Sequence, residues 1–201
     1  ASDIFGVISD CDGRLWISNN FGVCVYEPDI LNIRQYETAE GTFCSEFNEG
    51  AFYQSPDNQQ VMFGGSNGFV EFNPCNFKFN TFVPPVRISS YAFGFENVML
   101  VNQGFLDVKY DDAKEIKIER GNGEIVIFPG VLSYSMSSKN RFAWKLEGYD
   151  TKWDTALAII PVRYTNLTEG TYRFLYKGSN SDGVWSDEVN EITIKVIPPF
   201  F

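Results

Sequence analysis

Hydrophobic and polar residues alternate in short runs along the first part of the chain, and turn residues separate the runs. The stretch from Asp12 to Pro28 reads DGRLWISNNFGVCVYEP, with runs at Arg14–Ser18 and Val23–Tyr26 on either side of Asn19-Asn20. Runs of β-branched and aromatic residues bounded by Asp, Asn and Gly are typical of strands joined by hairpins. This stretch therefore predicts two antiparallel strands.

The same pattern returns 46 positions later, where the stretch from Asn58 to Pro74 reads NQQVMFGGSNGFVEFNP. The shift pairs Leu15 with Val61 and Gly22 with Gly68 without any gap. We therefore expect the second stretch to fold as the first does.

Two more strands are expected beside the first hairpin, at Phe5–Ser9 and Ile33–Tyr36, which makes four strands per repeat. A small sheet repeated at this spacing is typical of a β-propeller blade, because both of its faces are apolar and only neighbouring sheets can cover them. Residues 1–83 have room for one to two such sheets, whereas a closed propeller has roughly four or more. The prediction is a fragment, the last one to two blades of a propeller. An alternative is a pair of hairpin modules inside a β-sandwich.

The pattern changes at Pro84-Pro85, where two prolines stiffen an extended connection. We place a domain boundary there, between residues 1–83 and residues 84–201. Six further strands are expected in the second part. They are Arg87–Phe95, Ile116–Glu119, Ile125–Phe128, Arg141–Leu146, Tyr172–Lys177 and Glu191–Ile197.

The segment LTEGTYRF indicates the class of the second domain. Leu167, a turn at Gly170 and Tyr172 just inside a strand resemble the tyrosine corner of immunoglobulin-like and fibronectin-like sandwiches. In that corner the tyrosine hydroxyl bonds to the backbone just upstream. The predicted fold class is all-β, with propeller blades followed by an immunoglobulin/fibronectin-like β-sandwich.

Composition and charge limit the partners of the chain. Of 201 residues, 44% are apolar and 16% are aromatic, which is enough to bury a core. Residues 1–83 carry 3 Lys and Arg against 11 Asp and Glu, within a net charge of −10 for the whole chain. Such an acidic domain repels polyanions, so we do not expect nucleic acid as a partner. The apolar runs are too short for a membrane span within this segment.

The four cysteines, Cys11, Cys24, Cys44 and Cys75, form no CxxC pair, and the chain has no histidine. We therefore expect no metal site. In an oxidising compartment Cys11 and Cys24 could meet across neighbouring strands, but four cysteines allow several pairings. Free, half-buried thiols are the other interpretation, and the sequence does not choose between them.

No residue pattern predicts catalysis or a cofactor. The carboxylate pairs Asp10/Asp12 and Asp111/Asp112 lie in expected turns, where such groups commonly accept hydrogen bonds from local backbone donors. Without histidine there is no Ser-His-Asp or Cys-His nucleophile. The glycines of Gly64–Gly68 lack the spacing of a phosphate-binding loop and predict a tight β-turn. We expect this segment not to be an enzyme and to have no catalytic, cofactor-binding or metal-binding residues.

Three tryptophans are candidates for sugar stacking, since their faces suit the apolar faces of pyranose rings. Trp16 lies inside a repeated strand, which favours packing between blades. Trp153 and Trp185 each follow a polar turn, and we favour core or domain-contact roles for both. The sequence does not identify a ligand-binding residue.

Five blocks of the chain, in order, resemble the periplasmic sensor region of hybrid two-component systems, the one-chain receptor kinases of glycan-foraging gut bacteria. The stretch from Asp12 to Pro28 resembles their regulator-propeller repeat, and residues 45–74, with Glu46-Phe47-Asn48 and Phe63-Gly64-Gly65, resemble the last blade. FAWKLEGYDTKW, RYTNLTEGTYRF and SNSDGVWSD resemble the three blocks of the three-tyrosine (Y_Y_Y) domain that follows the propeller.

Two positions depart from the pattern of these receptors. Met62 stands where the first repeat has Trp16, and Phe142 stands where a tyrosine is usual. Both substitutions keep bulk, so we expect the fold to be unchanged, but an aromatic surface used for sugar stacking could differ.

The resemblance implies the membrane-proximal end of a periplasmic ectodomain in an inner-membrane receptor. Further propeller would precede the segment, a transmembrane helix would follow Phe201, and a histidine kinase would lie in the cytoplasm. An oligosaccharide would bind mainly to the missing propeller portion, and a homodimer would carry the signal through connections stiffened by Pro84-Pro85 and Pro198-Pro199. The alternative function is a carbohydrate-binding or accessory module of a secreted glycan-processing enzyme, in which the sandwich itself holds the sugar.

Overall fold

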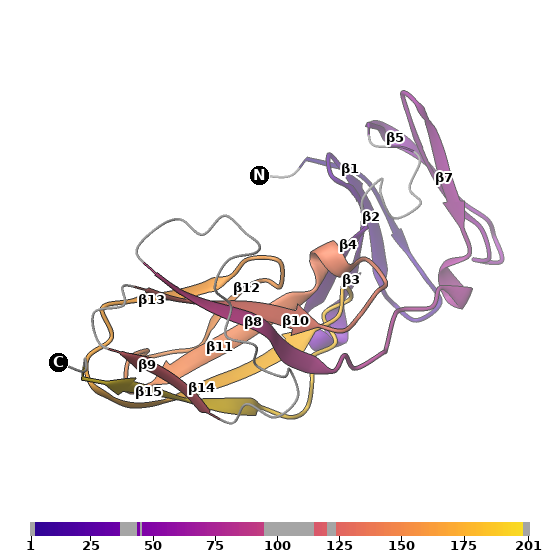
Figure 1. Cartoon of the computed structure of the whole chain (residues 1–201). Coiled ribbons are helices and arrows are strands. Elements are labelled where there is room, and N and C mark those ends of the chain that lie inside the picture. Colours follow the sequence, from indigo (N-terminus) through magenta and orange to yellow (C-terminus); the bar gives the residue numbers. More distant parts are fainter. Residues whose placement is uncertain (1–2, 37–43, 45, 95–114, 120–123, 199–201) are drawn as a thin grey trace. The chain divides into compact units, whose positions relative to one another are not determined.

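The computed structural model describes residues 3–36, 44, 46–94, 115–119 and 124–198 (Figure 1). In this part of the chain, regular structure consists of β-strands and short 3-10 helices, which confirms the predicted all-β class. The chain divides into two compact units, residues 1–79 and residues 80–201.

The first unit begins with a four-stranded antiparallel sheet in the order β1-β2-β3-β4. Its strands are β1 (Ile4–Ser9), β2 (Leu15–Asn19), β3 (Gly22–Glu27) and β4 (Asn32–Tyr36). A 3-10 helix, η1 (Pro28–Ile30), connects β3 to β4. These are the four strands that the first repeat predicts.

The second repeat forms its own sheet, in the order β5-β6-β7. Its elements are β5 (Phe47–Gln54), β6 (Val61–Gly65), β7 (Gly68–Phe72) and the 3-10 helix η3 (Pro74–Asn76). The hairpin registers of the two repeats match, because Leu15 pairs with Tyr26 as Val61 pairs with Phe72. The repeat read from the sequence is therefore a structural repeat.

Glycines close both hairpins in the same way. Gly22 and Gly68 have φ values of 131° and 141°, which side chains with a Cβ rarely adopt. Gly65 is required for a different reason, since an added Cβ would lie 2.1 Å from the carbonyl oxygen of Glu46. The tight turn expected from Gly64–Gly68 is confirmed.

The second repeat differs from the prediction of four strands per repeat. The 46-residue shift places residues 78–82 at the position of β4, but these residues form no strand. The backbone of Asn80 and Phe82 is instead hydrogen-bonded to Asn180 and Asp182 in the second unit's own fold. The competing partner is more than 90 positions away in the sequence, which is why the repeat pattern did not reveal it.

The second unit is a sandwich of two sheets, with orders β13-β10-β8 and β12-β11-β14-β15-β9. All neighbouring strands are antiparallel except β15 and β9, which are parallel. The strands are β8 (Val86–Gly94), β9 (Glu115–Glu119), β10 (Glu124–Val131), β11 (Arg141–Glu147), β12 (Asp154–Leu157), β13 (Val162–Thr165), β14 (Gly170–Ser179) and β15 (Asn190–Ile197). A 3-10 helix, η4 (Ser137–Lys139), precedes β11.

The six strands predicted for this unit are present, and β12 and β13 were missed. Each of the missed strands has only four residues, and the alternation of buried and exposed side chains along Val162–Thr165 is the signal that could have found β13. Phe95, where the first predicted strand of this unit would end, lies outside the described residues.

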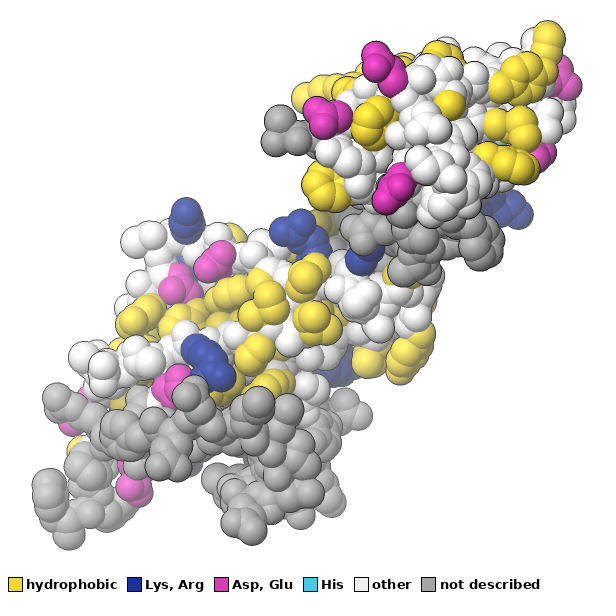
Figure 2. All heavy atoms as spheres, turned by 90° about the horizontal axis from the view of Figure 1, so that it is seen from above, with side chains coloured by type: hydrophobic (Ala, Val, Ile, Leu, Met, Phe, Trp, Pro, Cys, Tyr) yellow, Lys and Arg dark blue, Asp and Glu magenta, His cyan; other side chains and the backbone are white. Residues whose placement is uncertain are grey.

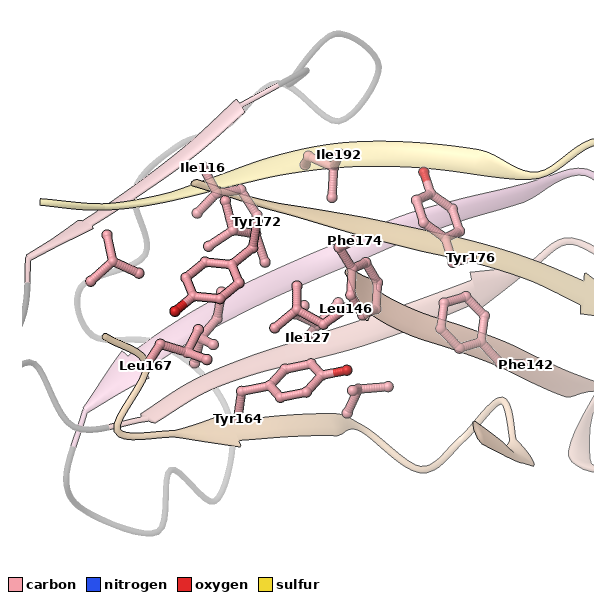
Figure 3. Packing of buried hydrophobic residues seen from close by; sticks show 14 of the residues in the cluster. Ile116, Ile127, Phe142, Leu146, Tyr164, Leu167, Tyr172, Phe174, Tyr176 and Ile192 are labelled. Atoms are coloured by element: carbon pink, nitrogen blue, oxygen red, sulfur yellow. The ribbon is translucent and has the colours of Figure 1, made fainter. Parts of the chain in front are cut away.

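The core of the sandwich is formed by side chains from both sheets (Figure 3). Ile127 of one sheet and Phe142, Leu146 and Phe174 of the other are fully buried. The phenyl ring of Phe142 stacks on those of Phe174 and Tyr176. Apolar side chains on alternate positions of each strand thus fill the space between the sheets.

The predicted tyrosine corner is confirmed. The hydroxyl of Tyr172 donates to the carbonyl oxygen of Thr168 at 3.0 Å, and it lies 2.9 Å from the hydroxyl of the same threonine. Its ring lies in the core beside Leu167 (Figure 3). The corner therefore fixes the chain where it enters β14.

Candidate functional site

A buried carboxylate holds the β1–β2 turn of the first unit. The side chain of Asp10 is 0% exposed. It accepts hydrogen bonds from Nε1 of Trp16 at 2.8 Å and Nε of Arg14 at 2.6 Å, and from the backbone N–H groups of Asp12 and Arg14. Burial alone would raise the pKa of Asp10, but these hydrogen bonds outweigh burial and the pKa lies below its ordinary value. The expected role of Asp10 as an acceptor for local turn donors is confirmed.

The same network ties the two sheets of the first unit together. The guanidinium of Arg14 donates to the carbonyl oxygen of Pro74 at 2.9 Å. The guanidinium groups of Arg14 and Arg34 both lie over the ring of Phe79, at 5.2 and 4.4 Å from its centre. Two cations of one sheet therefore contact the segment that follows the other sheet.

A disulfide between Cys11 and Cys75 also joins the two sheets of the first unit, because it links the β1–β2 turn to η3. The suggested meeting of Cys11 and Cys24 is therefore wrong, because Cys24 lies in β3 with its side chain buried and its thiol free. Burial raises the pKa of the Cys24 thiol. The interpretation of free thiols holds for Cys24 and Cys44 alone.

Trp16 lies between the two sheets, as predicted for a packing residue. It is 1% exposed, and its ring centre lies 4.5 Å from that of Phe72 and 4.9 Å from that of Phe77. The same apolar cluster includes Val25 on the first sheet and Phe63 on the second. Trp16 is therefore not a surface for sugar stacking in this structure.

The opposite face of the first sheet is apolar and has no covering sheet among the described residues. Alternation along β2 and β3 places four side chains on it. They are Leu15, Ile17, Cys24 and Tyr26. Val7 and Ile33 continue this face at the neighbouring strands and are 44% and 66% exposed. Figure 2 shows exposed hydrophobic side chains on the surface of this unit.

The repeat identifies this open face as a packing face. The equivalent residues of the second sheet turn toward the Trp16 side of the first sheet. They are Val61, Phe63, Val70 and Phe72. This face of the second sheet therefore packs on the sheet that precedes it in the chain. By the repeat, the face of the first sheet around Leu15 and Ile17 is the one that would pack on a preceding sheet.

The connection into the sandwich is bound to the sandwich itself. The amide Nδ2 of Asn180 donates to the carbonyl oxygens of Asn80 and Phe82, at 2.8 Å each. A carboxylate oxygen of Asp182 accepts from the backbone N–H of Asn80 at 2.8 Å. The backbone N–H of Leu132 donates to the carbonyl oxygen of Pro85. We call residues 80–85 the strap.

The strap begins before the predicted boundary at residues 83/84, since Asn80 and Phe82 already bond to the second unit. The oxygen Oδ1 of Asn180 accepts from the backbone N–H groups of Asp182 and Val184, which fixes the amide orientation. At the other end of the sandwich, Pro198 directly follows β15, and Pro199 lies outside the described residues.

Trp153 and Trp185 share one partner on the outer face of the five-stranded sheet. The ammonium of Lys177 lies 5.6 Å from the ring centre of Trp153 and 5.4 Å from that of Trp185. A cation over an aromatic face is stabilising, so Lys177 holds both rings against β14. The two tryptophans therefore share Lys177 as a neighbour, which their separation in the sequence did not indicate.

The remaining carboxylate candidates are described only in part. Asp12 forms an ion pair with Arg14 at 2.8 Å, and Asp111 and Asp112 lie outside the described residues. Within the residues that the structure describes, no cluster of His, Cys, Asp and Glu could hold a metal ion. In the same residues no helix is long and apolar enough to cross a bilayer.

The two departures noted in the sequence occupy different environments. Phe142 is fully buried in the sandwich core, so it is not part of an exposed aromatic surface. Met62 is half-buried and pairs with Glu71, on the face of the second sheet that turns away from Trp16. Only the change at Met62 therefore alters an accessible face.

Comparison with known proteins gives matches across the chain. Residues 133–196 match the Y_Y_Y domain family. Histidine kinase P4 of Formosa agariphila is 26% identical over 198 residues, which are 98% of this chain and 14% of that protein.

Solved structures share the fold. The extracellular domain of a protein from B. thetaiotaomicron, described as a hybrid two-component system, matches with a TM-score of 0.77 and 22% identity, over 98% of this chain and 26% of that one. A second such extracellular domain from the same bacterium matches with a TM-score of 0.51 and 21% identity, over 100% of this chain and 26% of that one. This chain therefore spans a small part of the relatives it matches. The comparisons confirm the resemblance read from the sequence blocks: residues 133–196 match the Y_Y_Y domain, and the chain has the fold seen in these extracellular domains.

Proposed function

We propose that this chain is the membrane-proximal part of the periplasmic sensor of a hybrid two-component histidine kinase. It passes a signal from an oligosaccharide bound mainly by the rest of a propeller, through the sandwich, to the membrane. The observation that carries this proposal is the strap, because Asn180 and Asp182 make the connecting residues part of the sandwich. A displacement that reaches Asn80 is then a displacement of the whole second unit.

Transmission needs a stiff body and a difference in binding energy. A ligand shifts the arrangement of two receptor subunits only if it binds one arrangement more tightly than the other. The sandwich suits this role because its core is continuous and its strands are fixed at the tyrosine corner. A homodimer of receptors would convert that rigid movement into a change at the membrane helices.

The disulfide supports a location outside the cytoplasm. Disulfides persist in oxidising compartments such as the periplasm and are rare in the cytosol. Cys11–Cys75 joins the β1–β2 turn to η3, where it adds to the contacts between the two sheets. The matched regions of the solved relatives are also described as extracellular.

The proposal is tested by softening the connections of the complete receptor. We would insert Gly-Ser-Gly-Ser between Phe79 and Asn80, or replace Pro198 and Pro199 by Gly-Ser. The control is the same insertion between Asp187 and Glu188, which are exposed and lie outside the strap. The measurements are glycan affinity by calorimetry and glycan-induced kinase output.

We expect both connection variants to bind glycan with unchanged affinity and to lose most of the induced output, while the control keeps it. Unchanged output in both connection variants would refute transmission through a stiff sandwich. Glycan binding by residues 84–201 alone would instead favour the alternative, a carbohydrate-binding or accessory module of a secreted glycan-processing enzyme.

A further inference from the structure

Part of the outer face of the five-stranded sheet carries cations without acidic partners. Arg141 and Lys145 of β11 and Lys177 of β14 lie on this face, because they alternate with the core residues of their strands. The residues opposite Arg141 and Lys145 on β14 are Ser179 and Leu175, which are uncharged. Among the described residues, no ion pair includes any of the three cations. This part of the face is therefore positively charged.

The rest of the same face has its charges in ion pairs. Arg173 pairs with Glu147 at 2.9 Å and with Glu191 at 2.6 Å. Lys195 pairs with Glu115 at 2.5 Å. The charges of the sheet are thus unevenly distributed, and the cations without a carboxylate partner lie nearer the end where β11 begins and β14 ends.

Two tryptophans lie among these cations. The ammonium of Lys177 holds the rings of Trp153 and Trp185, as described above. Ala143 and Ser179 are buried although they are on this outer face, so the side chains around them exclude water there. Trp153 itself remains exposed. We call Arg141, Lys145, Trp153, Lys177 and Trp185 the cationic patch.

The composition of the cationic patch is typical of a protein interface. Tryptophan and arginine are enriched among the residues that carry most of the binding energy in such interfaces. Rings that are already held against the sheet lose little conformational freedom when a partner binds. A partner that fits this patch has apolar side chains for the indole rings and a carboxylate for the cations.

The η1 turn of the first unit has these properties. Ile30 and Leu31 are 63% and 78% exposed, and the neighbouring Asp29 is also exposed. In the described part of the first unit, Asp29 takes part in no ion pair. The surrounding domain is acidic, with 3 Lys and Arg against 11 Asp and Glu in residues 1–83. We call Asp29, Ile30 and Leu31 the η1 tip.

The backbone of Leu31 indicates that the η1 tip does not serve the core of its own unit. The φ angle of Leu31 is 51°, in the left-handed region that glycine and asparagine adopt more readily than leucine. Because its side chain is exposed, the first unit gains no buried area from this strained leucine. Strained residues of this kind are found preferentially in binding and switching segments.

We propose that the η1 tip of one receptor copy docks on the cationic patch of a second copy. This inference rests on the proposed function, because it requires two receptor copies. Asp29 of one copy meets the cations of the other, while Ile30 and Leu31 cover the indole rings. A second copy is the favoured occupant because the chain itself supplies both complementary surfaces. In a dimer with two-fold symmetry the same contact forms twice.

The test measures the monomer–dimer equilibrium of the complete ectodomain, without glycan, by sedimentation equilibrium. Lys177→Glu reverses a charge of the cationic patch, and Asp29→Lys reverses the charge of the η1 tip. The control is Lys117→Glu, which makes the same charge change at an exposed side chain of β9. Leu31→Asn is an independent probe, because asparagine tolerates the left-handed conformation and the turn should remain folded.

We expect Lys177→Glu and Asp29→Lys each to weaken dimerisation about 10-fold, and the double variant to recover most of the loss, because the two charges are exchanged. Leu31→Asn should also weaken dimerisation about 10-fold without lowering the urea midpoint of the first unit. Lys117→Glu should leave dimerisation unchanged.

Three results would overturn the proposal. The first is equal dimerisation of the Lys177→Glu and Lys117→Glu variants. The second is a double variant that recovers none of the loss. The third is an unmodified ectodomain that remains monomeric at about 1 mM, since a contact weaker than this would not hold two receptors together in solution.

An anionic saccharide is the other occupant with the right charge, and calorimetry of the same ectodomain with an oligogalacturonate tests it. Saccharide binding that Lys177→Glu abolishes, together with unchanged dimerisation, would mean that the cationic patch is a saccharide site and that the proposal is wrong. Dimerisation is measured without glycan and without kinase output. Failure here is therefore distinguishable from failure of signal transmission.

Discussion

Replacing Asp10 by asparagine should destabilise the first unit without affecting the sandwich. One carboxylate oxygen, Oδ1, accepts from the backbone N–H groups of Asp12 and Arg14, at 2.9 and 3.0 Å. The other, Oδ2, accepts from Nε1 of Trp16 and Nε of Arg14. An asparagine oxygen can replace only one of the two, so its NH₂ group would face two donors.

The magnitude follows from the groups left without a partner. Nε1 of Trp16 is buried, and a buried donor without an acceptor costs about 1–3 kcal/mol. The side chain of Arg14 is 13% exposed, and breaking a buried ion pair on one side costs about 3–5 kcal/mol in enclosed sites. Part of the second cost is avoided because Arg14 keeps its ion pair with Asp12. We expect a loss of about 3 kcal/mol in the free energy of unfolding.

Trp16 is the tryptophan of the first unit, and the other three lie in the sandwich, so fluorine NMR of fluorotryptophan-labelled protein reports on the two units separately. In urea, with a slope of about 1–3 kcal/mol per molar, Asp10→Asn should lower the midpoint of the Trp16 resonance by about 1–3 M. The midpoints of the sandwich resonances should not change.

The control is Asp12→Asn. Asp12 pairs with the same arginine, but its side chain is 61% exposed, so its loss should cost less than about 1 kcal/mol. A Trp16 midpoint that moves no further in Asp10→Asn than in Asp12→Asn would refute the reasoning.

Three other predictions follow from the same structure. Cys75→Ser opens a cross-link over 64 residues and should lower the free energy of unfolding of the first unit by about 4 kcal/mol, measured by urea unfolding; reducing the unmodified protein should have the same effect. Tyr172→Phe removes the hydroxyl of the tyrosine corner and should cost the sandwich about 1–2 kcal/mol by the same method, and no change in its midpoint would contradict the assigned hydrogen bonds. Folding lowers the pKa of Asp10, so the ionised carboxylate stabilises the first unit above the unfolded pKa of 3.8, and this stabilisation is lost as the pH falls through the folded pKa. Unfolding measured below about pH 4 should show the loss, and the Asp10→Asn variant should not show it.

The hairpin repeat was predictable because its signals are local. Alternating runs and turn residues fix β2, β3, β6 and β7, and Gly22 and Gly68 occupy turn positions that favour glycine. Trp16 was correctly predicted to pack between sheets, since a large ring inside a repeated strand has a neighbouring sheet as its nearest cover. The tyrosine corner was predictable for the same reason, as its donor and acceptor are four residues apart.

Some of the features that were missed depend on distant partners. Cys11 pairs with Cys75 because the β1–β2 turn and η3 are adjacent in space, which no spacing of cysteines reveals. The hydrogen bond from Trp16 to Asp10 could have been suspected, because the second repeat loses both residues together and has Pro56 and Met62 at those positions. A carboxylate and an indole that are exchanged jointly between repeats indicate a contact.

The missing fourth strand and the strap have one cause. The backbone N–H groups of Asn80 and Phe82 donate to Asp182 and to the side chain of Asn80, so these N–H groups are not available for a fourth strand of the second sheet. In the first repeat the equivalent residues form β4. In the second repeat, the side-chain amide of Asn180 in the sandwich donates to the carbonyl oxygens of Asn80 and Phe82. Residues 78–82 form no fourth strand in the second repeat because the connection to the sandwich uses these residues.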